Sequence, residues 1–411
     1  MTYFAYQSGI RHCEDVPLPQ IAGAVGTPFY VYSKQALLNA YRALDSAFSG
    51  VDHLICYAIK ANPNLAVNNV LAEEGCGAEV VSGGELFRAL QAGYPPERMV
   101  FDGNAKTLEE LHYALEQDIY AINVDSENEL RVLAGLAKGM NRTARIALRV
   151  NPDVNPNTHP KISTGLKKSK FGVDPGKALQ CYEFARDHEA LQIAGIHAHI
   201  GSQILEVGPF AEAMAKVVDI GLELRNRGIE IEFIDIGGGI GIQYDDEQPP
   251  SYEAYAAALR EQWERFPVKI VLEPGRTIAG NIGNLVSKAL YVKETPEKRF
   301  VVIDAAMNDL WRPTMYDSYH RILPVNETHE TFVADVVGGV CESGDYMARD
   351  REMGVVNEGD LIAIESAGAY AASMSSEYNS RPLIPEVLVD GTSFRVVRRR
   401  PTYDEMVSLE T

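Results

Sequence analysis

Cysteine is scarce in this chain, and its scarcity argues against two kinds of structural framework. The 411 residues include five cysteines, an odd number, and none of them shows the Cys-x-x-Cys spacing. A disulfide framework or a structural zinc site needs paired or clustered cysteines, so we expect neither. Unpaired cysteines suit a reducing compartment, and we therefore expect a cytoplasmic protein.

Long apolar runs and an excess of basic residues are lacking as well. No uninterrupted apolar stretch is long enough to cross a bilayer, and no basic start followed by an apolar run marks a secretory signal. The 38 Lys and Arg residues are outnumbered by 57 Asp and Glu residues, which gives a net charge of −19. Such a chain repels polyanions, so we expect no nucleic-acid partner and no membrane partner.

The chain is long enough for two domains, each with its own core. In its middle part, apolar strand-like runs alternate with stretches whose apolar residues recur at helical spacing. Eight such β-then-α units are typical of a TIM-like (β/α)8 barrel; a doubly wound open sheet, the alternative, would usually not need eight. The predicted strands are LICYAI (54–59), AEVV (78–81), RMVF (98–101), YAINV (120–124), ARIALRV (144–150), IAGIHAHI (193–200), IEFIDI (231–236) and KIVLEP (269–274).

After about residue 280, helical patterns become rare and short β-rich runs dominate. This texture predicts a second domain of β-sandwich or small β-barrel type. We therefore expect an α/β barrel over residues 30–280 and an all-β domain formed by residues 1–29 and 281–411.

Unusual residues follow several of the predicted barrel strands, at the end of the barrel where active sites lie. Lys60 comes directly after the first strand. Partial burial there would lower the pKa of its amine, as a lysine that forms a Schiff base requires. A surface lysine in a loop is the alternative explanation.

Glycine-rich loops follow the seventh and eighth strands, where such barrels usually bind phosphate. The first is DIGGGIGI (235–242), and the second, EPGR (273–276), begins with Glu273 and Pro274. Glycines leave backbone N–H groups free to approach an anion. Glu273 could serve a buried ion pair with Arg276, or it could keep a pyridine nitrogen protonated, as the electron sink of pyridoxal chemistry requires.

The sixth strand ends in His197-Ala198-His199, with Ser202 shortly after it. No third ligand at a sensible spacing supports a zinc site. Side chains two positions apart on a strand share a face, so both histidines could line the barrel mouth, or both could belong to the core. The His199 ring could cover a flat cofactor, and the Ser202 hydroxyl could donate to its phosphate. Lysine, anion site, carboxylate and imidazole together suit an aldehyde cofactor with a phosphate group.

The chain resembles the diaminopimelate decarboxylases almost from end to end. This family consists of fold-type III pyridoxal-5′-phosphate enzymes with a barrel and a β-domain, which work as head-to-tail homodimers. Trp311 is bulkier than the aliphatic residue expected at its position. The segments that carry the resemblance are YAIKANPN (57–64), EVVSGGEL (79–86), FDGNAKT (101–107), RVNPDVNPNTHPKISTGLKKSKFGV (149–173), HIGSQI (199–204), DIGGGIGI, EPGR, MNDLWRPTMYDSYH (307–320), CESGD (341–345) and GAYAASMSSEYNSRP (368–382).

The resemblance implies a role for each matching residue. Lys60 would bind the cofactor covalently, His199 would stack on its ring, and Glu273 would bond to the ring nitrogen. The phosphate or the rest of the cofactor would be held by Ser202, Gly239, Gly275, Arg276 and Tyr370.

The resemblance also implies a substrate site. Arg276, Arg312 and Tyr316 would hold the distal carboxylate, with Tyr370 among the substrate-binding residues, and two arginines suit a carboxylate because the guanidinium binds it bidentately. Cys341 and Glu342 would come from the other subunit, with Cys341 near the reacting centre and Glu342 toward the distal amine.

The activity implied by the resemblance is decarboxylation of meso-2,6-diaminopimelate at its D-centre, giving L-lysine and carbon dioxide. Three alternatives stay open. A related decarboxylase could act on another basic amino acid such as D-ornithine or D-lysine. An amino-acid racemase shares the two-domain plan, although CESGD and MNDLWRPTMY argue against it. A non-catalytic pyridoxal-phosphate-binding protein is the third.

Overall fold

The structure is a computed structural model that describes residues 3–156, 158, 162, 164–165 and 169–410. Part of the 149–173 segment therefore lies outside the described residues. The chain forms two compact units: one comprises residues 1–39, 243–247 and 278–411, and the other comprises residues 40–242 and 248–277. Among the described residues, no helix combines the length and the apolar character needed to cross a membrane.

The second unit is built on a closed barrel of eight strands, in the order β10-β11-β12-β5-β6-β7-β8-β9, and every neighbouring pair is parallel. Each strand overlaps one of the eight predicted apolar runs, so the barrel prediction is confirmed. The strands are almost wholly buried, as strands covered on both faces must be. Their bounds are β5 (His53–Ala58), β6 (Gly77–Val80), β7 (Met99–Phe101), β8 (Ala121–Val124), β9 (Ala144–Arg149), β10 (Leu191–His197), β11 (Phe233–Asp235) and β12 (Lys269–Leu272).

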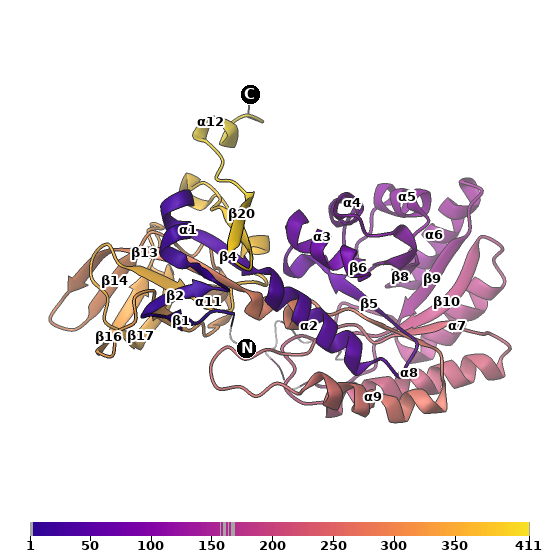
Figure 1. The fold of residues 1–411 in the computed structure, drawn as a ribbon. Coiled ribbons are helices and arrows are strands. Elements are labelled where there is room, and N and C mark those ends of the chain that lie inside the picture. The colour runs from indigo at the N-terminus through magenta and orange to yellow at the C-terminus, as the bar shows by residue number, and fades with distance from the viewer. Residues whose placement is uncertain (1–2, 157, 159–161, 163, 166–168, 411) are drawn as a thin grey trace. The chain divides into compact units, whose positions relative to one another are not determined.

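The helix α2 precedes the first barrel strand, and further helices follow the barrel strands along the chain and lie around them in Figure 1. Several begin at residues whose side chains bond to the first-turn backbone; Thr107 and Glu110, for example, form a reciprocal capping box. The helices are α2 (Lys34–Ala47), α3 (Leu65–Glu73), α4 (Gly83–Ala92), α5 (Leu108–Gln117), α6 (Glu127–Gly139), α7 (Pro175–Arg186), α8 (Gly208–Asn226), α9 (Tyr252–Arg265) and α10 (Arg276–Ala279), with 3₁₀ turns η1 (Ile59–Ala61) and η2 (Pro96–Arg98). The boundaries between the units fall within α2 and α10.

The barrel interior contains an apolar cluster of strand residues, which fills it with side chains and leaves no pore. Polar residues occupy the carboxyl ends of the same strands, so the interior changes from apolar to charged toward that end. The apolar cluster consists of Leu54, Cys56, Val100, Ala121, Ala147, Ala194, Phe233 and Val271.

The first unit is β-rich, as predicted, with a nine-stranded sheet. Its pairings are antiparallel except those of β14 with β16 and of β4 with β19. The strand β4 pairs with β13 and β19 inside this sheet, so the boundary between the units lies after it, at residues 39 and 40, later than the expected boundary at residue 30. The strands are β4 (Phe29–Ser33), β13 (Gly283–Glu294), β14 (Arg299–Ile303), β15 (Ile322–Pro324), β16 (Thr331–Val337), β17 (Tyr346–Gly354), β18 (Leu361–Ile364), β19 (Glu386–Asp390) and β20 (Ser393–Arg398).

A small three-stranded antiparallel sheet precedes β4 in the same unit. Apolar residues of this segment share one buried cluster with residues of the larger sheet, which attaches the amino-terminal part of the chain to it. The remaining elements of the unit are β1 (Tyr6–Gln7), β2 (Ile10–Cys13), β3 (Val16–Pro17), α1 (Leu18–Val25), α11 (Arg312–Tyr316), α12 (Tyr403–Met406), η4 (Gly280–Ile282), η5 (Ala372–Met374) and η6 (Tyr378–Ser380).

Candidate active site

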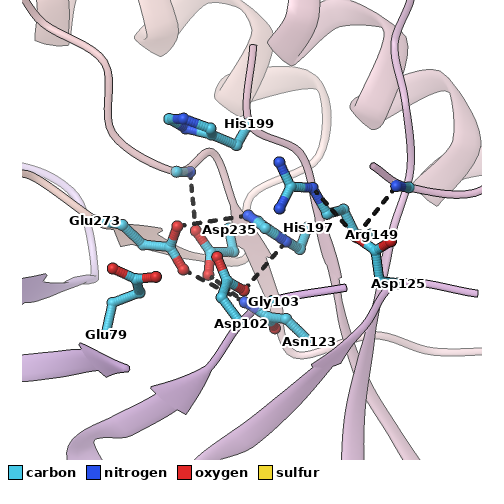
Figure 2. A network of polar contacts seen from close by, with 12 residues as sticks. Glu79, Asp102, Gly103, Asn123, Asp125, Arg149, His197, His199, Asp235 and Glu273 are labelled. Carbon is cyan, nitrogen blue, oxygen red and sulfur yellow. Dashed lines mark hydrogen bonds and ion pairs between the residues drawn. The ribbon is translucent and has the colours of Figure 1, made fainter. Parts of the chain in front are cut away.

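Every barrel strand contributes a polar residue at its carboxyl end, either in its last residues or just after it. Figure 2 shows most of these side chains converging inside the barrel. Two of them, Lys60 and Glu273, are predicted site residues. The full set is Lys60 after β5, Glu79 in β6, Asp102 after β7, Asn123 in β8, Arg149 in β9, His197 in β10, Asp235 in β11 and Glu273 after β12.

Lys60 lies in η1, directly after β5. Its Nζ is 2.5 Å from both carboxylate oxygens of Glu79, and its side chain is 39% exposed, whereas that of Glu79 is fully buried. Burial raises the pKa of Glu79 to about 7, although the neighbouring Lys60 charge lowers it. The pair therefore combines an accessible amine with a carboxyl group that can take up or release a proton near neutral pH.

Glu273 is buried at the end of β12, and its backbone N–H donates to the Gly237 carbonyl at 2.9 Å. The Asn123 side-chain amide donates to Glu273 at 3.4 Å and to Asp235 at 3.1 Å. Burial, together with the negative charge of Asp102, raises the pKa of Glu273 well above its usual range. A carboxyl group in this state ionises readily only when a cationic partner is close to it.

His197 has no exposed surface and lies between Glu273 and Asp102 (Figure 2). Its Nδ1 is 3.5 Å from an Asp102 oxygen, and its Nε2 is 3.5 Å from a Glu273 oxygen. His199, two residues further along, is only partly buried. His197 belongs to a buried polar cluster whose other members are Glu79, Asp102, Asn123, Asp235 and Glu273.

The loop after β11 passes close to two other backbone segments. A Cβ at Gly238 would lie 2.1 Å from the Glu273 carbonyl oxygen, so only glycine fits there. Gly239 has a φ of +123°, which side chains disfavour, and a Cβ there would lie 2.5 Å from the Gly201 carbonyl oxygen. The loop is therefore a tightly packed stretch of bare backbone, as the anion-site prediction requires.

His199 contacts this glycine loop through its ring. The Gly238 N–H donates to its Nδ1 at 3.3 Å, so Nδ1 carries no proton. Burial and the positive charge of Arg149 hold the pKa of His199 well below its usual range, and the ring is therefore neutral.

Ser202 and Arg276 lie together in the barrel unit. The Arg276 Nε and Nη2 donate to the Ser202 hydroxyl at 3.3 and 3.1 Å. Arg276 is buried, and so is Gly275 before it. The structure thus brings Lys60, His199, Ser202, Gly239, Glu273, Gly275 and Arg276 to the carboxyl ends of one barrel.

The other predicted site residues belong to the β-rich unit. Arg312 is the first residue of α11 and is buried, with its guanidinium 4.8 Å from the centre of the Tyr244 ring. It donates to the Ser318 hydroxyl at 3.1 Å and to His320 Nε2 at 3.4 Å. Because His320 Nδ1 donates to the Glu365 carbonyl at 2.8 Å, its Nε2 is left as an acceptor that orients Arg312.

Tyr316 ends the same helix and is partly exposed. Tyr370 follows β18 with a φ of +55°, an unusual conformation for an aromatic residue. Such strain occurs preferentially at binding sites, which makes Tyr370 a candidate on grounds other than its sequence motif.

Cys341 and Glu342 lie between β16 and β17, and both are exposed in the chain. The Cys341 N–H donates to the Asn379 side chain at 2.8 Å, and the Tyr378 hydroxyl donates to Glu342 at 2.8 Å. Trp311 stacks on the Tyr378 ring with centroids 6.3 Å apart, so the unexpectedly bulky residue supports the tyrosine that holds Glu342.

Comparisons with known proteins identify the class and then the family. The family described as "Pyridoxal-dependent decarboxylase, pyridoxal binding domain" matches residues 34–280, so the chain is a pyridoxal-dependent decarboxylase by class. A diaminopimelate decarboxylase of Aquifex aeolicus is 48% identical over 408 residues, which cover 98% of this chain and 96% of that protein. Within its class, the chain belongs to the diaminopimelate decarboxylase family.

Solved structures agree with this assignment. The diaminopimelate decarboxylase of Helicobacter pylori complexed with L-lysine superposes with a TM-score of 0.93 at 40% identity, covering 96% of this chain and 99% of that chain. The enzyme of M. jannaschii in co-complex with L-lysine gives a TM-score of 0.95 at 40% identity, covering 100% and 99%.

Several site residues escaped the sequence analysis. Glu79, Asp102, Asn123 and Asp235 all take part in the buried cluster, but none was predicted to belong to the site. The available signal was positional: each is a polar residue at the end of an otherwise apolar barrel strand.

Proposed function

We propose that this protein decarboxylates meso-2,6-diaminopimelate at its D-centre, giving L-lysine and carbon dioxide, with pyridoxal 5′-phosphate as its cofactor. One observation carries the proposal: a single barrel end holds the accessible Lys60 amine, the buried Glu273 carboxyl group and the bare glycine loop. Pyridoxal enzymes need an amine, a ring partner and a phosphate cradle, and this chain has a candidate for each.

The residues fit the cofactor on structural grounds. The loop at Gly238 and Gly239 leaves no room for side chains and can present its backbone to a phosphate. Glu273 is a buried carboxyl group with a raised pKa, and a protonated ring nitrogen would stabilise its ionised form. When bound, pyridoxal phosphate supplies an aldehyde for covalent attachment to amines and a protonated ring that accepts the electron pair left at Cα.

Lys60 and Glu79 would handle protons at the point of attachment. An amine attacks a carbonyl only in its neutral form. Glu79, with a pKa of about 7 and both oxygens against Nζ, can take the lysine proton and return it. Lys60 would in this way alternate between holding the cofactor and being released from it.

His199 and Glu273 would fix the ring from two sides. The neutral His199 ring, held by the Gly238 N–H, offers a flat face without a charge that would compete with the cofactor ring. Glu273 would bond to the ring nitrogen, with Asn123 holding its carboxylate in place. Ser202, Gly239, Gly275, Arg276 and Tyr370 would hold the phosphate and the rest of the cofactor.

The substrate proposal rests on the two relatives whose structures contain L-lysine, the proposed product. Arg312 supports it, because a buried guanidinium can bind a carboxylate bidentately and diaminopimelate offers a distal carboxylate. Arg276, Tyr316 and Tyr370 would complete the substrate contacts.

The reaction breaks the bond between Cα and its carboxylate, and carbon dioxide leaves while the electron pair stays behind. A proton then adds to Cα. We infer that Cys341 lies near this centre and that Glu342 binds the distal amine, both from the partner subunit of a homodimer. Their exposure in the single chain supports a role at a subunit interface.

The test is an assay with purified protein and pyridoxal phosphate, comparing carbon dioxide release from meso-diaminopimelate, D-ornithine and D-lysine. We expect turnover of meso-diaminopimelate and at most trace release from the others. Borohydride should fix the cofactor to Lys60, and peptide mapping would show it. A cofactor fixed to another lysine, or preferred turnover of D-ornithine, would contradict the proposal.

A further inference from the structure

The buried cluster beneath the proposed cofactor site contains more acids than bases. Glu79, Asp102, Asp235 and Glu273 are all buried within one barrel end. Lys60 contacts Glu79 at 2.5 Å, and its charge also lowers the pKa of Asp102 and of Glu273. One lysine cannot balance four buried carboxyl groups, so the remaining negative charge must be balanced by other residues or removed by protons.

His197 lies between two of these carboxyl groups, those of Asp102 and Glu273. Its ring has no exposed surface, and among the described residues neither nitrogen makes a hydrogen bond of ordinary geometry. Instead, Nδ1 faces Asp102 and Nε2 faces Glu273, each at 3.5 Å. A neutral imidazole has one bare nitrogen, which repels an ionised carboxylate, so one of the two acids would have to keep its proton and donate it to the ring. A doubly protonated ring offers a proton to each acid, and both acids can then be ionised.

We propose that His197 is a positioning residue, doubly protonated between Asp102 and Glu273, whose charge keeps Glu273 ionised and directed toward the ring nitrogen of the bound cofactor. This inference rests on the proposed function, because it assigns Glu273 to the cofactor. His197 itself would touch neither the cofactor nor the substrate.

The surrounding charges agree with a cation at this position. Asp235 lies beside the pair, joined to Glu273 through Asn123. Two other cations lie near these acids: Lys60 contacts Glu79, and Arg149 lies 3.8 Å from Asp125 and also lowers the pKa of Asp102. His199 does not contribute a charge, because its ring is neutral. The groups facing His197 from the packed strands are therefore mostly acids.

The shifts of the two acids point the same way. Burial raises the pKa of Asp102, but the positive charges of His197 and Arg149 outweigh it, and the pKa lies well below its usual range. Burial raises the pKa of Glu273, the Asp102 and Glu79 charges add to this, and the Lys60 charge lowers it only in part. Asp102 is thus the ionised partner of His197, and Glu273 is the acid whose charge depends on further positive neighbours.

A metal ion is the main competing explanation. Ligand atoms of Asp102, His197 and Glu273 all lie within 4.8 Å of one another, a spacing compatible with coordination. However, the two ring nitrogens face different carboxylates, and one ion can bind only one of them. Bridging by protons accounts for both contacts, so we favour the imidazolium.

The test compares His197→Gln with wild type, using His112→Gln as the matched control because His112 lies on an exposed face of α5. The readout is the affinity of cofactor-free protein for pyridoxal phosphate across pH. In wild type, binding should weaken as Glu273 takes up a proton on the acid side. In His197→Gln, affinity near neutral pH should fall about tenfold and the acid-side decline should move up by about one pH unit, because a neighbouring positive charge is lost.

A double variant distinguishes an effect of the His197 charge from an effect of its shape. Asp102→Asn combined with His197→Gln removes one negative and one positive charge, so affinity should recover toward wild type. If His197 only fills space, the double variant should bind as poorly as the single one or worse. That result, or an unchanged pH profile in His197→Gln, would overturn the inference.

A measurement on the unaltered holoenzyme covers the case in which the variants fail to fold. ¹⁵N spectra of histidine-labelled protein should contain one buried ring with both nitrogens protonated at neutral pH. A spectrum in which every buried ring has a bare nitrogen, or a stoichiometric metal found by elemental analysis and lost in His197→Gln, would overturn the inference. Neither outcome would touch the proposed function, which fails separately if wild type binds no pyridoxal phosphate.

Discussion

At the scale of single residues, the acids of the barrel end are governed first by burial. Glu79 illustrates this: even with Lys60 against both oxygens, its pKa is raised to about 7 from the usual 4.5. The free-energy cost of removing a carboxylate from water is larger than the favourable interaction with one partly exposed amine. The folded protein therefore holds a proton on Glu79 that the unfolded chain has released.

This proton makes the stability of the cofactor-free protein pH-dependent. Between pH 4.5 and 7 the folded state binds more protons than the unfolded state, so stability falls as pH rises, by up to about 3 kcal/mol from this group. Glu79→Gln should remove most of that slope and be no less stable than wild type at pH 8. Urea unfolding at several pH values measures it, with the exposed Glu116→Gln as a control that should keep the wild-type slope. An unchanged slope in Glu79→Gln would show that other acids dominate.

Arg312 shows the opposite case, a buried cation that is proposed to bind the distal carboxylate of the substrate. It is oriented by His320 and Ser318 and stacked on Tyr244. Arg312→Ala should lower kcat/KM for meso-diaminopimelate by about 3 kcal/mol, roughly a hundredfold, because the substrate carboxylate loses a bidentate, charge-assisted partner. Affinity for pyridoxal phosphate should change little.

The comparison for this prediction is Arg312→Lys, which keeps the charge but lacks the planar fork, so its loss should be intermediate. Arg131→Ala, on the exposed face of α6, should behave as wild type. Normal turnover by Arg312→Ala would remove the main physical support for the distal-carboxylate contact.

At the scale of elements, apolar runs and their period predict the barrel strands because each strand is buried on both faces. The sequence could not reveal which polar residues meet. Their contacts depend on the strand pairing and register of the closed barrel, such as β6 with β7 and β10 with β11, and these are set only on folding. Lys60 and Glu273 stood out by their positions and motifs, whereas Asn123 stands in no motif and Asp102, although part of FDGNAKT, was assigned no role. Their importance arises from the shared barrel interior.

The glycine loop after β11 offers a test at the same scale. Gly238→Ala would place a Cβ 2.1 Å from the Glu273 carbonyl oxygen, which forces the loops after β11 and β12 apart. We expect a loss of about 2 kcal/mol or more in the free energy of unfolding. Cofactor affinity should fall as well, because Glu273 follows the displaced backbone.

Gly135→Ala is the matched control for this substitution. Gly135 lies inside α6 with nothing within 4 Å of the added carbon, so alanine should stabilise the protein by about 0.5–1 kcal/mol. Urea unfolding and cofactor titration measure both variants. A Gly238→Ala protein as stable and as tightly binding as wild type would show that the loop is not constrained as described.

At the scale of the whole molecule, the two units divide the proposed work. The barrel holds the residues assigned to the cofactor except Tyr370, and the β-rich unit holds Tyr370 with Arg312, Tyr316, Cys341 and Glu342. The change from helical to β-rich patterns near residue 280 predicts this division. The assignment of β4 to the sheet could not be predicted, because it depends on pairing with strands far along the chain. The proposed homodimer adds a further level, in which a complete site needs two chains.

Subunit complementation tests directly whether a complete site needs two chains. If Glu342 acts in the partner's site, Lys60→Ala and Glu342→Ala proteins should each be nearly inactive, since every site in either homodimer carries a lesion. In a mixed dimer both lesions fall in one site, and the other site is intact. With random pairing, half of the dimers are mixed, so activity should rise to about a quarter of wild type.

A mixture of Lys60→Ala with Glu273→Ala is the control, because both lesions lie in the barrel and no pairing restores a site. Mass spectrometry of differently tagged chains would establish that subunits have exchanged. No recovery despite exchange would mean that Glu342 acts within its own chain or has no role in the site.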